Sequence, residues 1–94
     1  MEMKNTVKGK RFAFTGTLIS MKRNEAEDKV MNLHGIVQHF VNGNTDYLVT
    51  GNYQLSLFEP EKVTRKRKMA DQLLAQGSDL KIINEDIFLE MIYL

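Results

Sequence analysis

A short apolar run near the start of the chain, Phe12-Ala13-Phe14, constrains the fold more than any other stretch. It follows two basic residues, Lys10 and Arg11, and is cut off at once by Thr15-Gly16-Thr17. Such a run is typical of a strand buried on both faces, as in the centre of a parallel sheet covered by helices. Ligands of open α/β sheets bind at the carboxyl ends of such strands, so chemistry is expected at Thr15-Gly16-Thr17.

Composition limits the size and class of the protein. The 94 residues allow one compact domain with a modest core, and apolar and charged fractions of 43% and 27% are ordinary for a globular chain. No stretch approaches the roughly 20 apolar residues of a membrane helix, and the polar start predicts no signal peptide, so a cytoplasmic location is expected. The absence of cysteine excludes disulfides, a thiolate nucleophile and Cys-based zinc sites.

Helical and strand patterns alternate along the chain. The first strand is predicted at about residues 11–15, and Ala26, Val30 and Leu33 then lie on one face of a helix. In His34-Gly35 the glycine is expected to end this helix in the left-handed conformation. Further strands are predicted at 36–41, 47–49 and 80–83, and helices at 61–76, ended by Gly77, and after the N-cap Asn84.

The order β-α-β-β-α-β-α predicts an α/β fold, a parallel sheet with helices on both faces. The turn at residues 42–45 is too short for a parallel crossover between neighbours, so the second and third strands should lie on either side of the first. Residues 1–8 are expected to be a frayed lead-in. The apolar face of the second helix is predicted as Val63, Ala70 and Leu74 with Leu73 beside them, and that of the last helix as Ile87, Phe88, Met91 and Ile92.

Four segments, in this order, resemble the motifs of a BRCT domain: 9–18, 21–26, 44–49 and 82–89. The resemblance covers about residues 7–92 and is greatest to the bacterial branch, in particular the C-terminal BRCT domains of NAD-dependent DNA ligases. It implies one domain over residues 1–94, with a four-stranded parallel sheet in the order 2-1-3-4 flanked by three helices. The first and third helices should cover one face and the second helix the other.

The same resemblance implies a non-catalytic binding module of a DNA repair or replication protein, expected as the C-terminal part of a larger bacterial protein. The sequence departs from the family pattern at three places. Phe88 stands where many members carry Trp, and His34-Gly35 replaces the usual Gly-Gly. Lys22 replaces the usual Thr cap of the first helix, which predicts a less well capped helix start.

BRCT domains that bind phosphate use a Ser or Thr after the first strand, the next Gly N–H and a Lys in the second helix. The matching positions are Thr15, Gly16 and Lys66. A hydroxyl, an unhindered amide and an ammonium form a compact anion site. DNA phosphate, including a 5′-phosphorylated end, is the expected ligand, with a phosphorylated protein as an alternative. Neighbouring basic residues are expected to contact the DNA backbone: Lys62, Arg65, Arg67 and Lys68.

The competing interpretation is that Thr15-Gly16 only makes a tight turn and that the basic run is a solvated helix face.

A second motif offers a different function. Gln54-Leu55-Ser56-Leu57-Phe58 resembles the pentapeptide by which bacterial replication and repair proteins hold the sliding clamp, with adjacent apolar anchors for a pocket. The alternative function is therefore a protein-interaction scaffold that docks on the clamp, unless Leu55, Leu57 and Phe58 fold over the second helix.

No pattern in the sequence supports catalysis. His34 and His39 have no carboxylate at metal-ligand spacing, and the first strand is not followed by the glycines of a nucleotide-binding loop. Glu25, Glu27 and Asp28 fit solvated charges near a helix start, where the dipole favours them. We therefore expect no enzyme activity, cofactor or metal, and a small doubly wound enzyme domain is the least favoured alternative.

Overall fold

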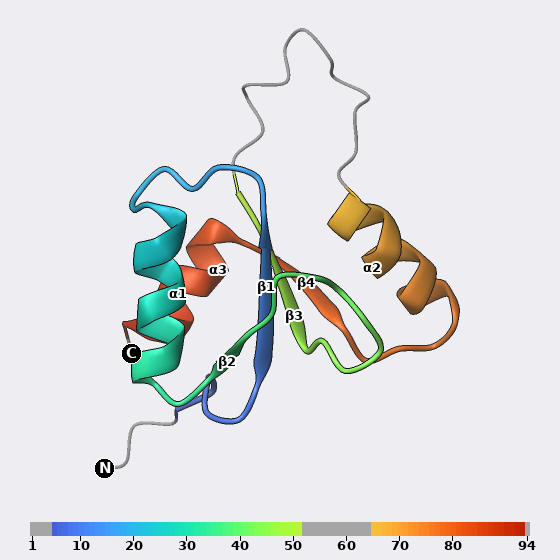
Figure 1. The fold of residues 1–94 in the computed structure, drawn as a ribbon, viewed down its shortest axis with the longest axis horizontal. Helices are drawn as coiled ribbons and strands as arrows, with labels where there is room; N and C mark the ends of the chain where they lie inside the picture. Colours follow the sequence, from blue (N-terminus) through green and yellow to red (C-terminus); the bar gives the residue numbers. More distant parts are fainter. Residues whose placement is uncertain (1–4, 52–64, 94) are drawn as a thin grey trace, which may run out of the picture.

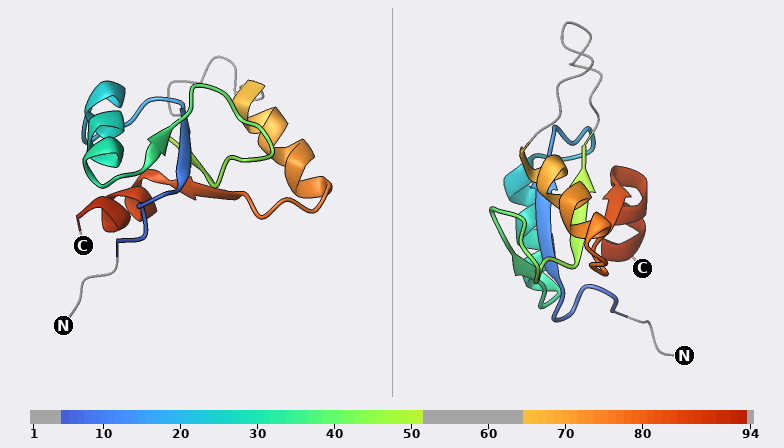
Figure 2. Two further views of the ribbon diagram at one scale, coloured as in Figure 1. Left: turned by 60° about the horizontal axis from the view of Figure 1, so that its bottom comes forward. Right: turned by 90° about the vertical axis from the view of Figure 1, so that its right-hand side faces the viewer.

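The computed structural model describes residues 5–51 and 65–93. Its elements, in chain order, are β1 (Arg11–Thr15), α1 (Arg23–Asn32), β2 (Ile36–Val37), β3 (Tyr47–Thr50), α2 (Arg65–Ala75), β4 (Lys81–Asn84) and α3 (Glu85–Ile92). The four strands pair in parallel in the order β2-β1-β3-β4, as predicted. Helices α1 and α3 lie on one face of the sheet and α2 on the other (Figures 1 and 2).

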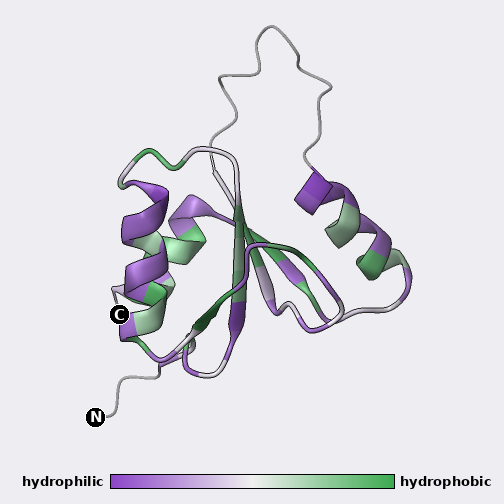
Figure 3. Ribbon diagram, viewed as in Figure 1, coloured by the Kyte–Doolittle hydropathy of each residue, from purple (hydrophilic) through white to green (hydrophobic). Residues whose placement is uncertain are grey.

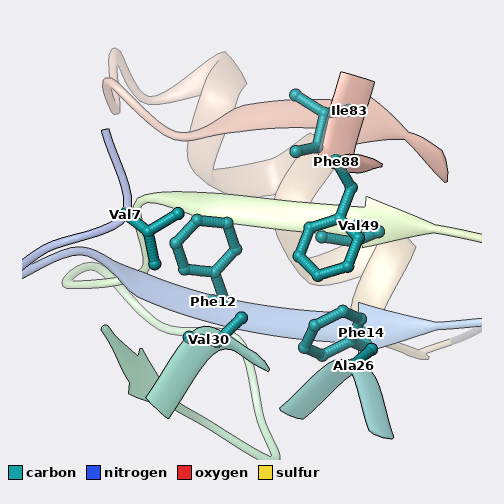
Figure 4. Close-up of a cluster of buried hydrophobic side chains, with 8 residues drawn as sticks. All are labelled: Val7, Phe12, Phe14, Ala26, Val30, Val49, Ile83 and Phe88. Carbon is teal, nitrogen blue, oxygen red and sulfur yellow. The ribbon is translucent and has the colours of Figure 1, made fainter. Parts of the chain in front are cut away.

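The larger core lies between the sheet and the pair α1 and α3. Side chains alternate along β1, so Phe12 and Phe14 both enter this core. The Phe88 ring meets Phe12 and Phe14 edge to face, with centroids 6.1 and 5.2 Å apart. Phe88 therefore joins both phenylalanines of β1 in one aromatic cluster. The buried cluster consists of Val7, Phe12, Phe14, Ala26, Val30, Val49, Ile83 and Phe88 (Figure 4).

The smaller core lies under α2. The β1 residue between the two phenylalanines, Ala13, faces this side, where it joins Leu48 of β3 and Ala70 of α2. Its buried members are Ala13, Val41, Leu48, Ala70 and Leu80, with Leu73 and Ile82 packed against them. The central strand is thus buried on both faces, which is why its sequence is almost wholly apolar.

The N-terminal lead-in is not frayed where the structure describes it, so that prediction was wrong for residues 5–8. Val7 is fully buried in the larger core. Asn5 fixes the segment, because its Oδ1 accepts hydrogen bonds from the Val7 and Lys8 N–H groups while its Nδ2 donates to the Leu33 carbonyl.

The second strand is shorter than predicted and ends at Val37 instead of 41. Gln38 still donates its N–H to the Phe12 carbonyl, but its buried side-chain oxygen accepts a hydrogen bond of 2.6 Å from the Thr45 hydroxyl. This hydrogen bond joins the start of the connection between β2 and β3 to the end of that connection. The chain leaves the sheet at this point in spite of the apolar residues that follow.

The end of α1 differs from the prediction in one residue. His34, with φ of 68°, takes the left-handed conformation, and Gly35 does not. The His34 N–H donates to the Met31 carbonyl and the Gly35 N–H to the Val30 carbonyl, the pair of bonds of a Schellman motif. Gly35 is required for packing instead, since a Cβ there would come within 2.6 Å of Val30 Cγ1 and 2.7 Å of Val7 Cγ1.

The remaining helices largely match their predicted ends. Gly77, with φ of 94°, follows α2, and the Asn84 side chain caps α3 by accepting from the Ile87 N–H. The start of α2 predicted at residue 61 lies outside the described residues. Two apolar assignments were wrong: Leu73, not Leu74, packs under α2, and Ile87 is exposed at the surface of α3.

Candidate functional site

The carboxyl edge of the sheet brings three elements together. At this edge the end of β1, the loop that leads to α1 and the first turn of α2 meet (Figure 1). Lys66, in that first turn, reaches back across the sheet, and its Nζ donates a hydrogen bond of 2.6 Å to the Phe14 carbonyl. The structure therefore places Lys66 against the end of β1, as the family resemblance predicted.

Helical spacing explains why Lys66 points inward. Lys66, Ala70 and Leu73 are spaced i, i+4 and i+7, so they share one face of α2. Ala70 is fully buried and Leu73 packs against the smaller core, so Lys66 continues an inward-facing row. Arg65 and Lys68 lie on other faces of the helix and are exposed, as predicted.

The environment of Lys66 lowers the pKa of its ammonium. Partial burial is the largest cause, and the positive charge of Arg23 acts in the same direction. Glu27 opposes them because its carboxylate favours the charged ammonium. Two cations and one carboxylate therefore interact electrostatically at this edge.

Thr15 and Gly16 form the end of β1 on which these cations converge. Thr15 is only 4% exposed, and strand alternation places its side chain on the α2 face, the face from which Lys66 approaches. Its carbonyl accepts a hydrogen bond from the Gly51 N–H. Gly16 has φ of 82°, a conformation that favours glycine, and the chain turns there toward α1.

Arg23 is a site residue that the sequence analysis missed. Its Nη2 donates a hydrogen bond of 2.7 Å to the Gly16 carbonyl. This carbonyl is two residues after the Phe14 carbonyl that Lys66 contacts. A signal was present, because Arg23 is the first residue of α1, where the helix dipole favours negative charge and disfavours positive charge. A cation at that position does not stabilise the helix, so it indicates a role in contacts outside the helix.

Glu25 and Glu27 were expected to be solvated charges, and the structure gives each a partner. Glu25 Oε1 accepts a hydrogen bond of 3.2 Å from the Lys22 N–H, so it supplies part of the capping that Lys22 cannot. Glu27 Oε2 lies 3.4 Å from His39 Nε2. Glu27 therefore contacts an exposed histidine and also acts electrostatically on Lys66.

Two contacts hold the loop after Gly16 in place. The carboxylate of Glu85, at the start of α3, accepts hydrogen bonds from the Ile19 and Ser20 N–H groups and from the Ser20 hydroxyl. Although burial alone would raise it, these hydrogen bonds lower the pKa of Glu85. Gly51 packs so closely on the loop that a Cβ there would lie 2.4 Å from the Thr17 carbonyl oxygen.

The basic run beside the site is strongly hydrophilic at the start of α2 (Figure 3). Arg67 Nε pairs with Asp71 Oδ1 at 3.4 Å, an exposed contact one helical turn away. Such a pair neutralises part of the charge but adds little stability. Lys62 and the segment Gln54–Phe58 lie outside the described residues, so their predicted roles stay predictions.

Within residues 5–51 and 65–93, no group of three or more histidine, aspartate or glutamate side chains is placed to hold a metal ion. None of the helices in these same ranges is long and apolar enough to cross a membrane.

The sheet order, the three flanking helices and the cationic carboxyl edge define a small α/β binding module. The family model for the BRCA1 C Terminus (BRCT) domain matches residues 5–92. The chain belongs to the BRCT family. This agrees with the resemblance that the sequence motifs indicated.

Similar proteins include several bacterial DNA ligases. The chain is 38% identical over 86 residues to the DNA ligase of Coprothermobacter proteolyticus and 36% identical over 85 residues to that of Chlamydia caviae. It is 30% identical over 90 residues to the DNA ligase of Coxiella burnetii. These alignments cover 92%, 90% and 96% of the chain but 11% of each ligase, so the chain spans about a tenth of their length.

Proposed function

We propose that this BRCT domain is a binding module of a DNA repair or replication protein and that it binds a phosphate group of DNA. The phosphate site consists of Thr15, Gly16, Lys66 and Arg23. The observation that carries the proposal is the convergence of two cations on the end of β1, with Lys66 bonded to the Phe14 carbonyl and Arg23 to the Gly16 carbonyl.

The electrostatics of this edge favour an anion. The positive charge of Arg23 lowers the pKa of Lys66, so the two cations interact unfavourably without a ligand. A phosphate between them relieves this repulsion and accepts charge-assisted hydrogen bonds from both. Lys66 is already partly desolvated, so it loses less hydration on binding than an exposed lysine would. The Gly16 N–H, on a residue that has no side chain of its own, completes the site.

DNA fits this site better than a small phosphate does. Arg65 and Lys68 are exposed on other faces of the same part of α2, and we expect them to extend the positive charge beyond one phosphate group. A polyanion with evenly spaced phosphates uses both the site and this extension. The resemblance to bacterial DNA ligases supports the same ligand.

The experiment is an amide chemical-shift titration with short duplex DNA, with and without a 5′-phosphate, at two salt concentrations. We expect shifts centred on Gly16, Arg23 and Lys66. The Lys66→Ala variant should bind at least about tenfold more weakly, because a charge-assisted hydrogen bond contributes about 1.5–3 kcal/mol. Lys68→Ala is the matched control, since it removes an exposed lysine of the same helix and should change affinity about twofold.

Equal losses in the two variants, both weakening steeply with salt, would mean nonspecific backbone contact and would contradict the proposed site. An absence of shifts with any DNA would remove DNA as the ligand. A phosphoserine peptide is then the next ligand to titrate against the same Lys66→Ala variant.

A second candidate function rests on the sequence alone. We propose, as the alternative, that Gln54–Phe58 docks on the bacterial sliding clamp, with Leu57 and Phe58 as its apolar anchors. The double substitution Leu57→Ala and Phe58→Ala should abolish binding to purified clamp while it leaves DNA binding unchanged. Unaltered clamp binding by this variant would exclude the motif.

A further inference from the structure

Ile19 projects into solvent beside the proposed phosphate site. Its side chain is 74% exposed, the largest value among the exposed large apolar residues of the described chain. A single exposed isoleucine needs no explanation by itself, but the position of Ile19 is unusual. It lines two hollows at the carboxyl edge. One, of about 530 Å³, is also lined by Gly16 and Arg23, and the other, of about 320 Å³, by Glu85 and Asp86.

The backbone of Ile19 is held firmly in this position. Its N–H donates to Glu85 Oε1 at 2.9 Å, and the adjacent Ser20 N–H donates to Glu85 Oε2 at 2.7 Å. The Ser20 hydroxyl donates to the same carboxylate. The exposed side chain therefore stands on a fixed loop, and a ligand that packs on it loses little entropy in ordering that loop.

The two hollows beside Ile19 differ in the sign of their charge. Lys22 and Arg23 line the first hollow together with one carboxylate, Glu25, so its charged residues are net positive. Glu85 and Asp86 line the second hollow. A DNA strand whose phosphate occupies the cationic side and whose backbone continues past Ile19 would bring its next phosphates toward two carboxylates. A strand that ends at the cationic side avoids this repulsion. The end of a duplex also exposes the flat face of its last base pair, which an apolar side chain can cover.

We propose that Ile19 determines specificity for duplex ends, by packing on the exposed face of the terminal base pair while the terminal phosphate occupies the site of Gly16, Arg23 and Lys66. Glu85 and Asp86 oppose the continuous backbone of an uninterrupted duplex. This inference rests on the proposed function and adds to it the residue that selects a duplex end and the contact by which it does so.

The first test uses fluorescence. The chain contains no tryptophan, so Ile19→Trp introduces one indole as the only tryptophan reporter. A duplex with open, 5′-phosphorylated ends should quench and shift its emission by stacking. A duplex of the same sequence closed at both ends by hairpin loops should not. Ile36→Trp is the matched control, because Ile36 is also exposed but pairs with Arg11 at the opposite edge of the sheet.

The second test compares affinities for the same two duplexes. The wild-type chain should prefer the open duplex, and Ile19→Ser should reduce that preference about three- to tenfold while its affinity for the closed duplex stays constant. Ile36→Ser should leave the preference unchanged. Both substitutions are at exposed positions, so folding is retained and circular dichroism verifies it.

Lys66→Ala, measured in the same series, separates the two proposals. If Lys66→Ala weakens binding of both duplexes and Ile19→Ser leaves the preference intact, the role of Ile19 is wrong and the phosphate site stands. If Lys66→Ala has no effect on either duplex, the phosphate site itself is wrong. Equal quenching of the indole by open and closed duplexes would also overturn the role of Ile19.

Discussion

The two faces of the sheet are packed very differently. On the face of α1 and α3, the Phe88 ring contacts both Phe12 and Phe14, and eight residues are buried in one cluster. On the face of α2, the buried cluster formed by residues 5–51 and 65–93 has five members, two of them alanines, and none of these five is aromatic. Free energy from apolar burial grows with the area removed from water, so the first face contributes more to stability.

The thinner face is the one that carries Lys66. Of the residues of α2, Ala70 alone is fully buried, and Leu73 is partly buried. Because its described residues bury little apolar surface, we expect α2 to open locally at a lower free energy than the core strands do. The molecule therefore separates the face that stabilises it from the face that positions a proposed binding residue. Substitutions on the first face should unfold the chain, and substitutions on the second should loosen α2.

The largest effect is expected from Phe88→Ala. Phe88 is fully buried between Phe12 and Phe14, and removing its ring leaves a cavity in the larger core. The free energy of unfolding should fall by about 3–5 kcal/mol, measured by urea denaturation. Ile87→Ala is the control, because Ile87 is 43% exposed on the same helix and should cost well under about 1 kcal/mol. Comparable losses in the two variants would contradict the central role of the aromatic cluster.

A smaller and more local effect is expected from Leu73→Ala. Leu73 is partly buried, so its loss should cost about 1–2 kcal/mol, less than the usual cost at a fully buried leucine. Amide hydrogen exchange should accelerate in α2 while β1 and β3 keep their protection, and DNA affinity should fall with the loss of order around Lys66.

Leu74→Ala is the matched control for that experiment, since Leu74 is the next residue of the same helix and is 39% exposed. It should leave both exchange and affinity close to the wild-type values. Uniform acceleration of exchange across the whole sheet in Leu73→Ala would show that the two faces unfold as one unit, and the proposed separation would be lost.

The smallest effect concerns the loop at the carboxyl edge that joins β1 to α1. Glu85→Gln removes the charge that accepts hydrogen bonds from Ile19 and Ser20, and the free energy of unfolding should fall by about 1 kcal/mol at neutral pH. Because the folded-state pKa of Glu85 is lowered, its contribution is present above the ordinary glutamate pKa of roughly 4.3. It is lost as the pH falls through the lower, folded-state pKa.

The measurement is the difference in unfolding free energy between wild type and Glu85→Gln, followed from about pH 7 to about pH 3. That difference should shrink in acid. Glu90→Gln, at an exposed position of the same helix, serves as the control and should show no such trend. A difference that is constant over the whole range would mean that the carboxylate charge does not hold the loop.

Much of the fold followed from local patterns that are strong in this chain. The bounds of β1 were predicted at 11–15 as observed, because only a strand buried on both faces explains so apolar a run. The caps at Asn84 and Gly77 and the inward direction of Lys66 followed from short-range geometry. The end of β2 did not, because the chain there makes a buried side-chain hydrogen bond between Gln38 and Thr45, and no local pattern records a contact between residues seven apart.

The sequence by itself determined the alternation of elements, the central strand, the sheet order and the position of Lys66. These depend on periodicity, on loop length and on the family motifs. Only the tertiary structure decided that His34 takes the left-handed position, that Val7 belongs to the core and that Arg23 joins Lys66 at one edge. The reason is physical: these outcomes depend on contacts between segments far apart in the chain, and neither helical spacing nor strand alternation records which segments will meet.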